Sequence, residues 1–368
     1  MKHLLLISLS VGAGHVRVAE AIEKTAKREY PNLRVTHIDL MDYISLPMKR
    51  AILDSYDLMI KRLPELWGYF YEKMNDPETS QKFHRVTTTL QRMNSRRLYE
   101  YIEETQPDHI LCTHFLPADV IEEGRKRYGI DTPVSVVVTD YDVHGLWTSS
   151  HASHYFVATE KIQWKLIQRG IKPEQVTVSG IPIDPDIFSS KNENSLRQEL
   201  HIPPEDRILL LLAGGQGSSK SDTVLKILCE SKQPATIIAI AGKNKRLEKK
   251  LRATTVPSHI KLIVLGWTDH IHDYLRIADV IITKPGGATT TECIQLQKPI
   301  IAINPIPGQE EQNTTYILHK GFGVAAQSAE DLLYYISLSP EQLAPGYKRS
   351  NKKSAGSAAE VVLDTLVS

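Results

Sequence analysis

Short apolar runs alternate with segments of helical periodicity along most of this chain. Residues 4–9 are apolar and lead into a glycine-rich turn, after which apolar residues recur at helical spacing over residues 16–30. A second apolar run, at residues 33–40, gives the order strand, helix, strand. The same alternation returns over residues 109–179 and restarts at residue 207. This pattern predicts an α/β fold with parallel sheets.

The alternation falls into two blocks, and 368 residues are too many for one ordinary core. We therefore expect two Rossmann-like domains that face a cleft. The predicted boundaries are an N-terminal domain at residues 1–188, a linker at 189–206 and a C-terminal domain at 207–345. Residues 346–368 are predicted to be helical and to pack back on the first domain.

Composition narrows the possible environments and partners. The formal net charge of +1, with 24% charged residues, argues against a nucleic-acid-binding surface. The three cysteines, Cys112, Cys229 and Cys293, form no CxxC pair, which disfavours structural zinc and fits a reducing cytoplasm. The chain begins directly with a strand pattern, without a signal-peptide cleavage site, and no apolar run approaches the roughly 18 residues of a membrane span. Any membrane contact is therefore expected to be peripheral.

The stretch at residues 283–292, Thr-Lys-Pro-Gly-Gly-Ala-Thr-Thr-Thr-Glu, is the strongest candidate for ligand binding. It follows a predicted buried strand, turns at Gly286 and Gly287, and opens a helix with Thr289 and Thr290. Backbone N–H groups at a helix N-terminus are unpaired and suit a phosphate or diphosphate. Glu292 lies about one turn further on, where it can accept hydrogen bonds from sugar hydroxyls. The structural alternative is a tight turn with a threonine cap.

A second candidate lies at the end of the first strand, where Gly12, Gly14 and His15 form a Gly-x-Gly-His sequence. As a nucleotide motif it is weak, because the third glycine of the dinucleotide fingerprint is absent. His15 is expected at the carboxyl edge of a parallel sheet, where α/β proteins bind ligands, and can act there as a general base. A surface histidine that caps the helix is the alternative.

Residues 44–100 interrupt the alternation with aromatic, methionine and basic side chains. Such a mixture suits a helix that lies on an anionic bilayer, and it also suits helices packed on the domain with a solvated basic face. The candidate membrane contacts are Lys61, Arg62, Trp67, Phe70, Arg96 and Arg97.

Neither a P-loop nor a metal motif is present. The glycine loop at residues 214–220 lacks the P-loop spacing. His144, His151 and His154 match no zinc spacing. Asp140 and Asp142 form an Asp-x-Asp pair, but we assign it to an orienting or acceptor contact and expect no metal.

Five motifs together resemble one family. They are Gly12–His15 with the following helix, Thr139-Asp140 with His144 and Trp147, Gly180–Ile183, Thr283–Glu292, and Pro307–Asn313. In order and spacing they resemble the diacylglycerol glycosyltransferases of glycosyltransferase family 28. These comprise the processive bacterial glucosyltransferases and the plant-type monogalactosyldiacylglycerol synthases, and they are related to the peptidoglycan GlcNAc transferase. The resemblance spans nearly the whole chain and implies the GT-B fold.

The resemblance implies an inverting transferase that moves a hexose from a UDP-sugar to diacylglycerol or a glycosyl-diacylglycerol at the cytoplasmic face of the membrane. It implies His15 as the base that deprotonates the acceptor hydroxyl, and no metal or other cofactor. The implied donor-binding residues are Gly214, Gln216, Gly266, Trp267, Gly286, Gly287, Thr289, Thr290, Glu292, Gln309, Glu310 and Asn313. The implied acceptor-side residues are Gly14, Asp140, His144 and Trp147. A relative of the plant type carries an acidic residue in place of Gln216, and the motifs leave glucose, galactose and GlcNAc open as the sugar.

Three other functions remain open at this point. One is a UDP-GlcNAc transferase that acts on a polyprenyl-diphosphate lipid, although the helix after His15 and the insertion at residues 44–100 favour diacylglycerol. Another is a UDP-sugar 2-epimerase, which needs no lipid-facing surface. The third is a non-catalytic UDP-sugar sensor, for which His15 is dispensable while Glu292 is essential.

Overall fold

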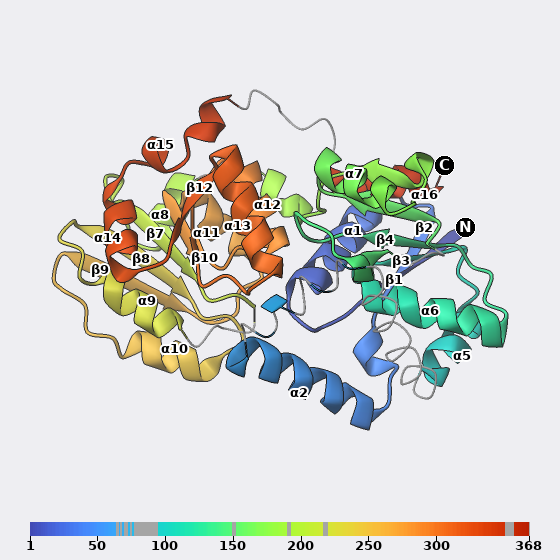
Figure 1. Cartoon of the computed structure of the whole chain (residues 1–368). Helices are drawn as coiled ribbons and strands as arrows, with labels where there is room; N and C mark the ends of the chain where they lie inside the picture. The colour runs from blue at the N-terminus through green and yellow to red at the C-terminus, as the bar shows by residue number, and fades with distance from the viewer. Residues whose placement is uncertain are drawn as a thin grey trace. The chain divides into compact units, whose positions relative to one another are not determined.

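The computed structural model describes residues 1–63, 66, 68–69, 73, 76, 95–148, 152–189, 193–215, 220–349 and 357–367. The chain divides into two compact units (Figure 1). Unit 1 comprises Met1–Pro185, Ile306–Gln309 and Ser354–Ser368, and unit 2 comprises Asp186–Pro305 and Glu310–Lys353.

Unit 1 is built on a six-stranded sheet whose paired strands all run parallel, in the order β2-β1-β3-β4-β5-β6. The strands are β1 (Lys2–Ser8), β2 (Leu33–Asp39), β3 (His109–Cys112), β4 (Val134–Val137), β5 (His154–Val157) and β6 (Val176–Val178). The central strands β1 and β4 are buried on both faces, which is why residues 4–7 of β1 read as a continuous apolar run rather than as an alternating one.

Helices cover both faces of this sheet. Side chains from three helices join one core with the strands: α5 (Arg96–Thr105), α6 (Phe115–Tyr128) and α7 (Glu160–Gln168). The last helix, α16 (Ala358–Val367), packs on the first one, α1 (Gly14–Glu29). The Tyr30 hydroxyl donates to the Asp364 carboxylate at 2.6 Å, so the end of the chain is fixed to the α1–β2 corner. The remaining helical elements are α2 (Leu46–Arg62), η1 (Leu40–Asp42), η2 (Gly145–Trp147) and η3 (Pro173–Gln175).

Unit 2 repeats this architecture with a parallel sheet of order β12-β11-β10-β7-β8-β9. Its strands are β7 (Ile208–Leu212), β8 (Ala235–Ile240), β9 (Ile260–Leu265), β10 (Val280–Thr283), β11 (Ile300–Ile303) and β12 (Gly323–Ala326). One face packs on α9 (Ser221–Leu228), α10 (Lys245–Arg252) and α14 (Ala329–Ser337). The other face packs on α8 (Glu193–Glu199), α11 (Ile271–Ile277), α12 (Gly287–Gln295) and α13 (Gln309–Lys320). The short elements η4 (Pro185–Phe188), α15 (Pro340–Leu343) and η5 (Pro345–Arg349) complete the described chain.

The α/β class and the parallel sheets predicted from the apolar pattern are confirmed, with strand and helix ends shifted by up to three residues. Helix α8 lies inside the stretch expected to be a linker, because Leu196 and Leu200 at its end pack against the unit 2 core. Within the stretch at residues 44–100, α2 and the start of α5 are described, whereas most of residues 64–94 lies outside the described residues.

Each sheet has a topological switch point, where successive strands are added on opposite sides. In unit 1 it lies between β1 and β3, and in unit 2 between β7 and β10. Ligands of open α/β sheets bind beyond the carboxyl ends of the strands at such points. The turns that lead into α1, at Gly14 and His15, and into α12, at Gly286 and Gly287, both begin there.

Candidate active site

His15 is the second residue of α1 and lies at the switch point of unit 1. The carboxyl ends of three adjacent strands meet there, because Thr113 follows β3 and Thr139 lies two residues beyond β4. The His15 Nδ1 atom lies 3.1 Å from the Thr113 carbonyl oxygen and 2.7 Å from the Thr139 hydroxyl oxygen. The Thr113 hydroxyl donates to the His15 carbonyl at 2.9 Å, so both the ring and the backbone of His15 are held.

The imidazole of His15 is uncharged at neutral pH. Burial lowers the pKa of His15 to about 4, and the hydrogen bond to the Thr113 carbonyl offsets that effect only in part. A neutral imidazole can accept a proton from an alcohol, which is the property that a general base requires.

Two further histidines lie near His15 on unit 1. The ring of His114 meets His15 edge to face, with centroids 4.5 Å apart, and Phe115 follows at 4.2 Å from His114. His144 and Trp147 complete the cluster of rings, at 5.3 and 5.6 Å from Phe115. Burial lowers the pKa of His144 to about 3 and holds the pKa of His114 well below its usual value. These side chains therefore form an uncharged, largely apolar wall.

The tautomers of His114 and His144 follow from their role as caps. The Nδ1 atom of each accepts a backbone N–H two residues on, from Leu116 at 3.1 Å and from Leu146 at 3.3 Å. Each ring therefore carries its proton on Nε2. The sequence motifs do not single out Thr113, His114 and Phe115, although these residues come directly after a buried strand, the same signal that pointed to His15.

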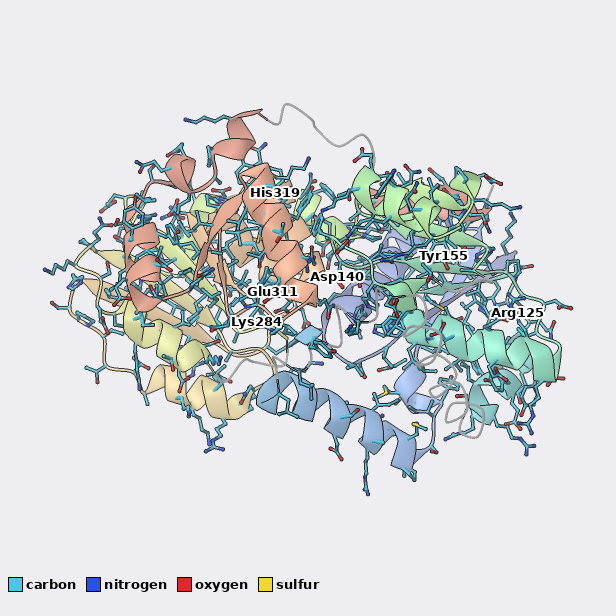
Figure 2. The ribbon with its side chains drawn as sticks, viewed as in Figure 1. Arg125, Asp140, Tyr155, Lys284, Glu311 and His319 are labelled. Atoms are coloured by element: carbon cyan, nitrogen blue, oxygen red, sulfur yellow. The ribbon has the colours of Figure 1, made fainter. Side chains whose placement is uncertain are left out.

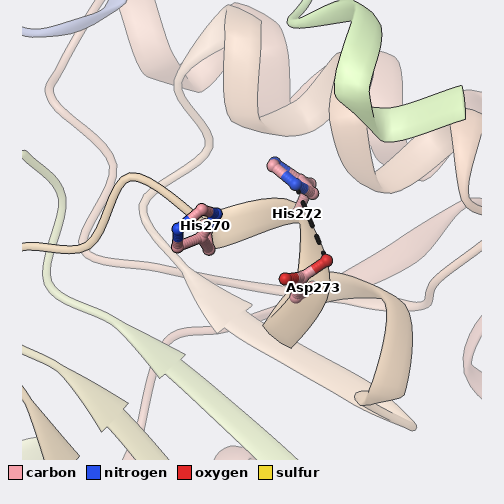
Figure 3. A group of neighbouring side chains, drawn as sticks. All are labelled: His270, His272 and Asp273. Carbon is pink, nitrogen blue, oxygen red and sulfur yellow. Dashed lines mark ion pairs between the residues drawn. The ribbon is translucent and has the colours of Figure 1, made fainter. Parts of the chain in front are cut away.

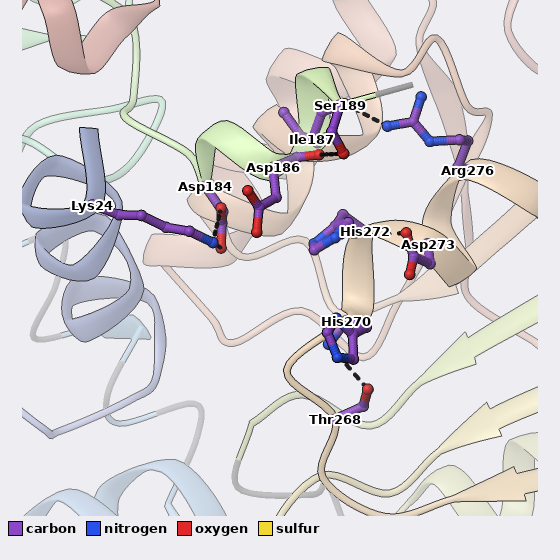
Figure 4. Close-up of polar contacts among 10 residues, drawn as sticks. All are labelled: Lys24, Asp184, Asp186, Ile187, Ser189, Thr268, His270, His272, Asp273 and Arg276. Carbon is purple, nitrogen blue, oxygen red and sulfur yellow. Dashed lines mark hydrogen bonds and ion pairs between the residues drawn. The ribbon is translucent and has the colours of Figure 1, made fainter. Parts of the chain in front are cut away.

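The predicted acceptor-side residues gather at the carboxyl edge of the unit 1 sheet. Gly14 opens α1, and Asp140 follows Thr139 after β4 and is buried (Figure 2). Asp142 forms an ion pair with Lys165 of α7, which accounts for the second carboxylate of the Asp-x-Asp pair. Lys24 of α1 forms an ion pair of 2.8 Å with Asp184, which follows β6 (Figure 4).

In unit 2 the predicted diphosphate site has the expected local form. Strand β10 ends at Thr283, Gly286 is the N-cap, and α12 begins at Gly287. The N–H of Thr290 donates to the Gly286 carbonyl at 2.9 Å, so it closes the first turn of the helix. The open N–H groups therefore belong to Gly287, Ala288 and Thr289. Thr290 is fully buried and its N–H is used within the helix, so the ligand contact predicted for Thr290 stays a prediction.

Helix α13 is fastened to this turn by two side chains. The Asn313 amide donates to the Pro285 carbonyl at 2.9 Å, and Asn313 is fully buried. Lys284 extends from the turn (Figure 2) and forms an ion pair of 3.1 Å with Glu310. Gln309 is the first residue of α13, beside Glu310. Asn313 and Glu310 thus join α13 to the turn predicted to bind the diphosphate. Glu292 of α12 is buried, at 3% exposure.

The other predicted donor-binding residues of unit 2 lie in the loops after β7 and β9. Gly214 comes after β7 with a φ of 76°, and Gly266 and Trp267 come after β9. Trp267 is 46% exposed, donates from Nε1 to Asp269 at 2.9 Å, and has the Lys243 ammonium 4.5 Å from its ring centroid. Gln216 lies outside the described residues.

The membrane candidates are only partly described. Trp67 and Phe70 lie outside the described residues, and so do the side chains of Lys61 and Arg62 at the end of α2. Arg96 and Arg97 are exposed at the start of α5, where Arg96 forms an ion pair of 2.7 Å with Glu100. Among the described residues, no helix is both long and apolar enough to cross a membrane.

One group in unit 2 offers three possible metal ligands, His270, His272 and Asp273 (Figure 3). Their ligand atoms lie within 4.8 Å of one another, and His272 Nε2 is 3.6 Å from the Asp273 carboxylate. The backbone N–H of His270 donates to the Thr268 hydroxyl at 3.1 Å, and Arg276 donates to the Ile187 carbonyl at 2.7 Å (Figure 4). The spacing of the three residues matches none of the zinc motifs. The ion pair between His272 and Asp273 explains why those two side chains lie together.

Comparisons with known proteins agree with this division of the chain. A family model described as monogalactosyldiacylglycerol (MGDG) synthase matches residues 15–183, and one described as glycosyl transferases group 1 matches residues 193–339. The processive diacylglycerol beta-glucosyltransferase of Bacillus licheniformis is 28% identical over 375 residues, which cover 100% of this chain and 94% of that relative.

Solved structures show the same fold at low sequence identity. Acinetobacter baumannii MurG has a TM-score of 0.60 at 14% identity, with 99% of each chain covered. A Neisseria meningitidis UDP-GlcNAc 2-epimerase bound to UDP-GlcNAc has a TM-score of 0.61 at 14% identity, with 100% of each chain covered. Because transferases and epimerases share this architecture, the fold by itself does not separate them.

The fold and the full-length sequence similarity together define a glycosyltransferase of the GT-B type. Within that class, the chain carries an MGDG synthase domain followed by a group 1 glycosyl transferase domain. Over its full length the chain is similar to processive diacylglycerol beta-glucosyltransferases, the family that the five sequence motifs resemble.

Proposed function

We propose that this protein transfers a hexose from a UDP-sugar to the hydroxyl of diacylglycerol, or of a glycosyl-diacylglycerol, with inversion at the anomeric carbon. The observation that carries the proposal is the similarity over the whole chain to processive diacylglycerol beta-glucosyltransferases. A β-linked product from an α-linked UDP-sugar requires inversion, which a single in-line displacement achieves.

In this proposal His15 is the general base. An alcohol has to lose its proton as the new glycosidic bond forms, and the neutral imidazole of His15 can take it. His15 lies next to the uncharged ring of His114 and, beyond it, that of Phe115, both partly exposed, and such a surface suits an acceptor with apolar chains.

The donor is assigned to unit 2. The open N–H groups of Gly287, Ala288 and Thr289 carry the positive end of the α12 dipole, which stabilises the charge that develops on the leaving diphosphate. The Lys284 ammonium adds a positive charge next to this turn and is oriented by Glu310. With the diphosphate stabilised in this way, we propose that the reaction needs no metal ion.

We further propose that the protein acts as a peripheral protein on the cytoplasmic face of an anionic membrane. Supporting this, α2 and the residues just after it expose apolar side chains beside basic ones. Those with large exposed fractions are Leu46 at 71%, Leu53 at 39%, Leu63 at 42%, Leu66 at 41% and Tyr69 at 56%. Apolar side chains that enter the headgroup region bind in proportion to the apolar area that they bury.

The transfer reaction is tested with liposomes that contain diacylglycerol and an anionic lipid. Radiolabelled UDP-glucose, UDP-galactose and UDP-GlcNAc are supplied in separate tubes, each with and without EDTA. We expect label in the lipid phase from one donor, unchanged by EDTA, and its loss in His15→Ala. His259→Ala is the matched control, because His259 is far from both strand switch points in sequence and bonds to the Ser231 carbonyl.

Each other outcome has a definite meaning. Loss of transfer with EDTA would contradict the metal-independent reaction and direct attention to His270, His272 and Asp273. Binding of UDP-sugar without transfer to any lipid would reject the acceptor assignment, and polyprenyl-diphosphate acceptors would be tested next. Full function of His15→Ala in the cell, together with loss on Glu292→Ala, would support the sensor.

The membrane proposal has its own test, vesicle sedimentation. The double variant Leu46→Ser, Leu53→Ser removes two exposed apolar side chains from α2 and should weaken binding to anionic vesicles by about tenfold or more. Tyr334→Ser, which removes an equally exposed aromatic ring from α14, is the control. Equal weakening in both variants, or none in either, would show that α2 is not the docking surface.

A further inference from the structure

The ring of His15 has two neighbours on one nitrogen, and their chemistry differs. A carbonyl oxygen, here that of Thr113 at 3.1 Å, has lone pairs and no proton, so it can only accept. The hydroxyl oxygen of Thr139, at 2.7 Å from the same Nδ1 atom, can either donate or accept.

The carbonyl settles the position of the proton. If Nδ1 lacked a proton, its lone pair would face the lone pairs of the Thr113 carbonyl at 3.1 Å, which is unfavourable. With the proton on Nδ1, both oxygens accept from it. Thr139 is then an acceptor, and Nε2 retains the lone pair that a base requires.

Both partners are rigidly placed. Thr113 and Thr139 are buried, at 0% and 3% exposure, and follow two adjacent strands, β3 and β4. The Thr113 N–H also donates to the Ile7 carbonyl at 3.1 Å, which ties this corner to β1. The other titratable ring against His15 is that of His114, which is uncharged.

We propose that Thr139 is a positioning residue for His15: its hydroxyl oxygen accepts the Nδ1 proton, together with the Thr113 carbonyl, so that Nε2 faces the acceptor as the base. This inference deepens the proposed transferase function and rests on it. When Nε2 takes the proton of the acceptor hydroxyl, the ring becomes an imidazolium. The bond from Nδ1–H to Thr139 then becomes a charge-assisted bond and strengthens in the transition state.

A change that removes this bond should therefore lower kcat rather than affinity for the donor. For Thr139→Val, a near-isosteric change without the hydroxyl, we expect kcat to fall about tenfold to a hundredfold, the range of a hydrogen bond to a charged group. The KM for UDP-sugar should be unchanged, since the donor is assigned to unit 2. Thr139→Ser restores the hydroxyl and should recover most of the rate.

The matched control is Thr25→Val. Thr25 is also buried, at 2% exposure, lies on the same helix as His15, and bonds only along that helix to the Ala21 carbonyl at 2.9 Å. It should keep the wild-type kcat. A wild-type kcat in Thr139→Val, or a loss in Thr139→Val that Thr139→Ser does not reverse, would overturn the proposal.

A spectroscopic measurement on the wild-type full chain tests the geometry without reference to activity. With ¹⁵N-labelled histidine, the chemical shift of each ring nitrogen distinguishes a protonated nitrogen from one with a lone pair. The resonances of His15 are assigned by their loss in His15→Gln. We expect a protonated Nδ1 and a lone pair on Nε2, and the reverse would overturn the proposal even if the variants were inactive.

The two readouts also separate failure of this inference from failure of the proposed function. If no donor and lipid pair supports transfer, the kinetic arm is lost with the transferase assignment, whereas the NMR arm still decides the tautomer. If transfer is found and His15→Ala abolishes it, the proposed function stands, and the kinetic and NMR measurements then test only the role of Thr139.

Discussion

The side chain of Asn313 links α13 to the Gly-Gly turn of unit 2, and its removal tests whether that link organises the donor site. Its amide donates to the Pro285 carbonyl at 2.9 Å inside the core. In Asn313→Ala the bond is lost and a buried carbonyl loses a donor, which costs about 1–3 kcal/mol. For a domain of this size each kcal/mol lowers Tm by about 2–4 °C, so a decrease of about 2–12 °C is expected.

The functional effect should appear in donor binding. The turn that holds Gly286 and Gly287 keeps the Lys284–Glu310 ion pair but loses its hydrogen bond from α13, so its N–H groups have to be ordered in part by the ligand. We expect the KM for UDP-sugar to rise about tenfold, equivalent to about 1.4 kcal/mol, with a smaller change in kcat. Calorimetry and steady-state kinetics with the donor varied measure the two quantities.

Two further variants make the result interpretable. Asn313→Asp keeps the size but places a carboxylate oxygen against the Pro285 carbonyl, so it should be at least as damaging as Asn313→Ala. Thr314→Val removes a neighbouring buried hydroxyl that bonds only to the Glu310 carbonyl within α13, and it should leave the KM unchanged. A wild-type KM in Asn313→Ala, with Tm lowered as in Thr314→Val, would refute the reasoning.

Three other outcomes are expected. Unit 1 should lose stability as pH falls from 6.5 to 5. Burial lowers the pKa of three histidines to about 3 or 4, so in this pH range the unfolded chain binds more protons than the folded chain. Each histidine should lower the free energy of unfolding by up to about 1.4 kcal/mol per pH unit. The histidines are His15, His109 and His144. Thermal unfolding measured from pH 7.5 to 5 should show Tm falling with pH, and the fall should be smaller in His109→Gln. A Tm that does not depend on pH would contradict the prediction. Gly242→Ala should lower Tm and raise the KM for the donor. The φ of Gly242 is 64°, and a Cβ there would lie 2.5 and 2.7 Å from two carbonyl oxygens of the loop after β7. Gly170→Ala, at a φ of 92° with open space around it, shows the effect of φ alone on kinetics and calorimetry. Val362→Asp should release α16 from α1, since a fully buried position would hold an unpaired carboxylate, and limited proteolysis should then cut near the C-terminus; full protection would refute this.

Local patterns in the sequence identified most of the elements that position the site. The apolar runs of β1 and β10, and the glycines that follow them, predicted two strand-to-helix turns because a buried parallel strand and a helix N-terminus have strong local requirements. The position of His15 at a sheet edge followed from the same pattern. The ends of elements differed by up to three residues, since end positions depend on capping and packing.

Other features depend on contacts between distant residues. The Thr139 hydroxyl is 124 positions from His15, and the Asn313 amide is 28 positions from the Pro285 carbonyl. Nothing in the local sequence at either end specifies such a pair. The burial of Thr290 in the first turn of α12 depended on how that helix is rotated against the sheet of unit 2.

The sequence by itself thus determined the α/β class, the two glycine turns, the candidate base and the family, because each depends on residues close together in the chain or on motifs in a fixed order. The tertiary structure alone decided which strand ends converge, and therefore which side chains hold the ring of His15. The order β2-β1-β3-β4 brings Thr113 and Thr139 to that ring, and strand order is set by the packing of the whole sheet rather than by any one segment.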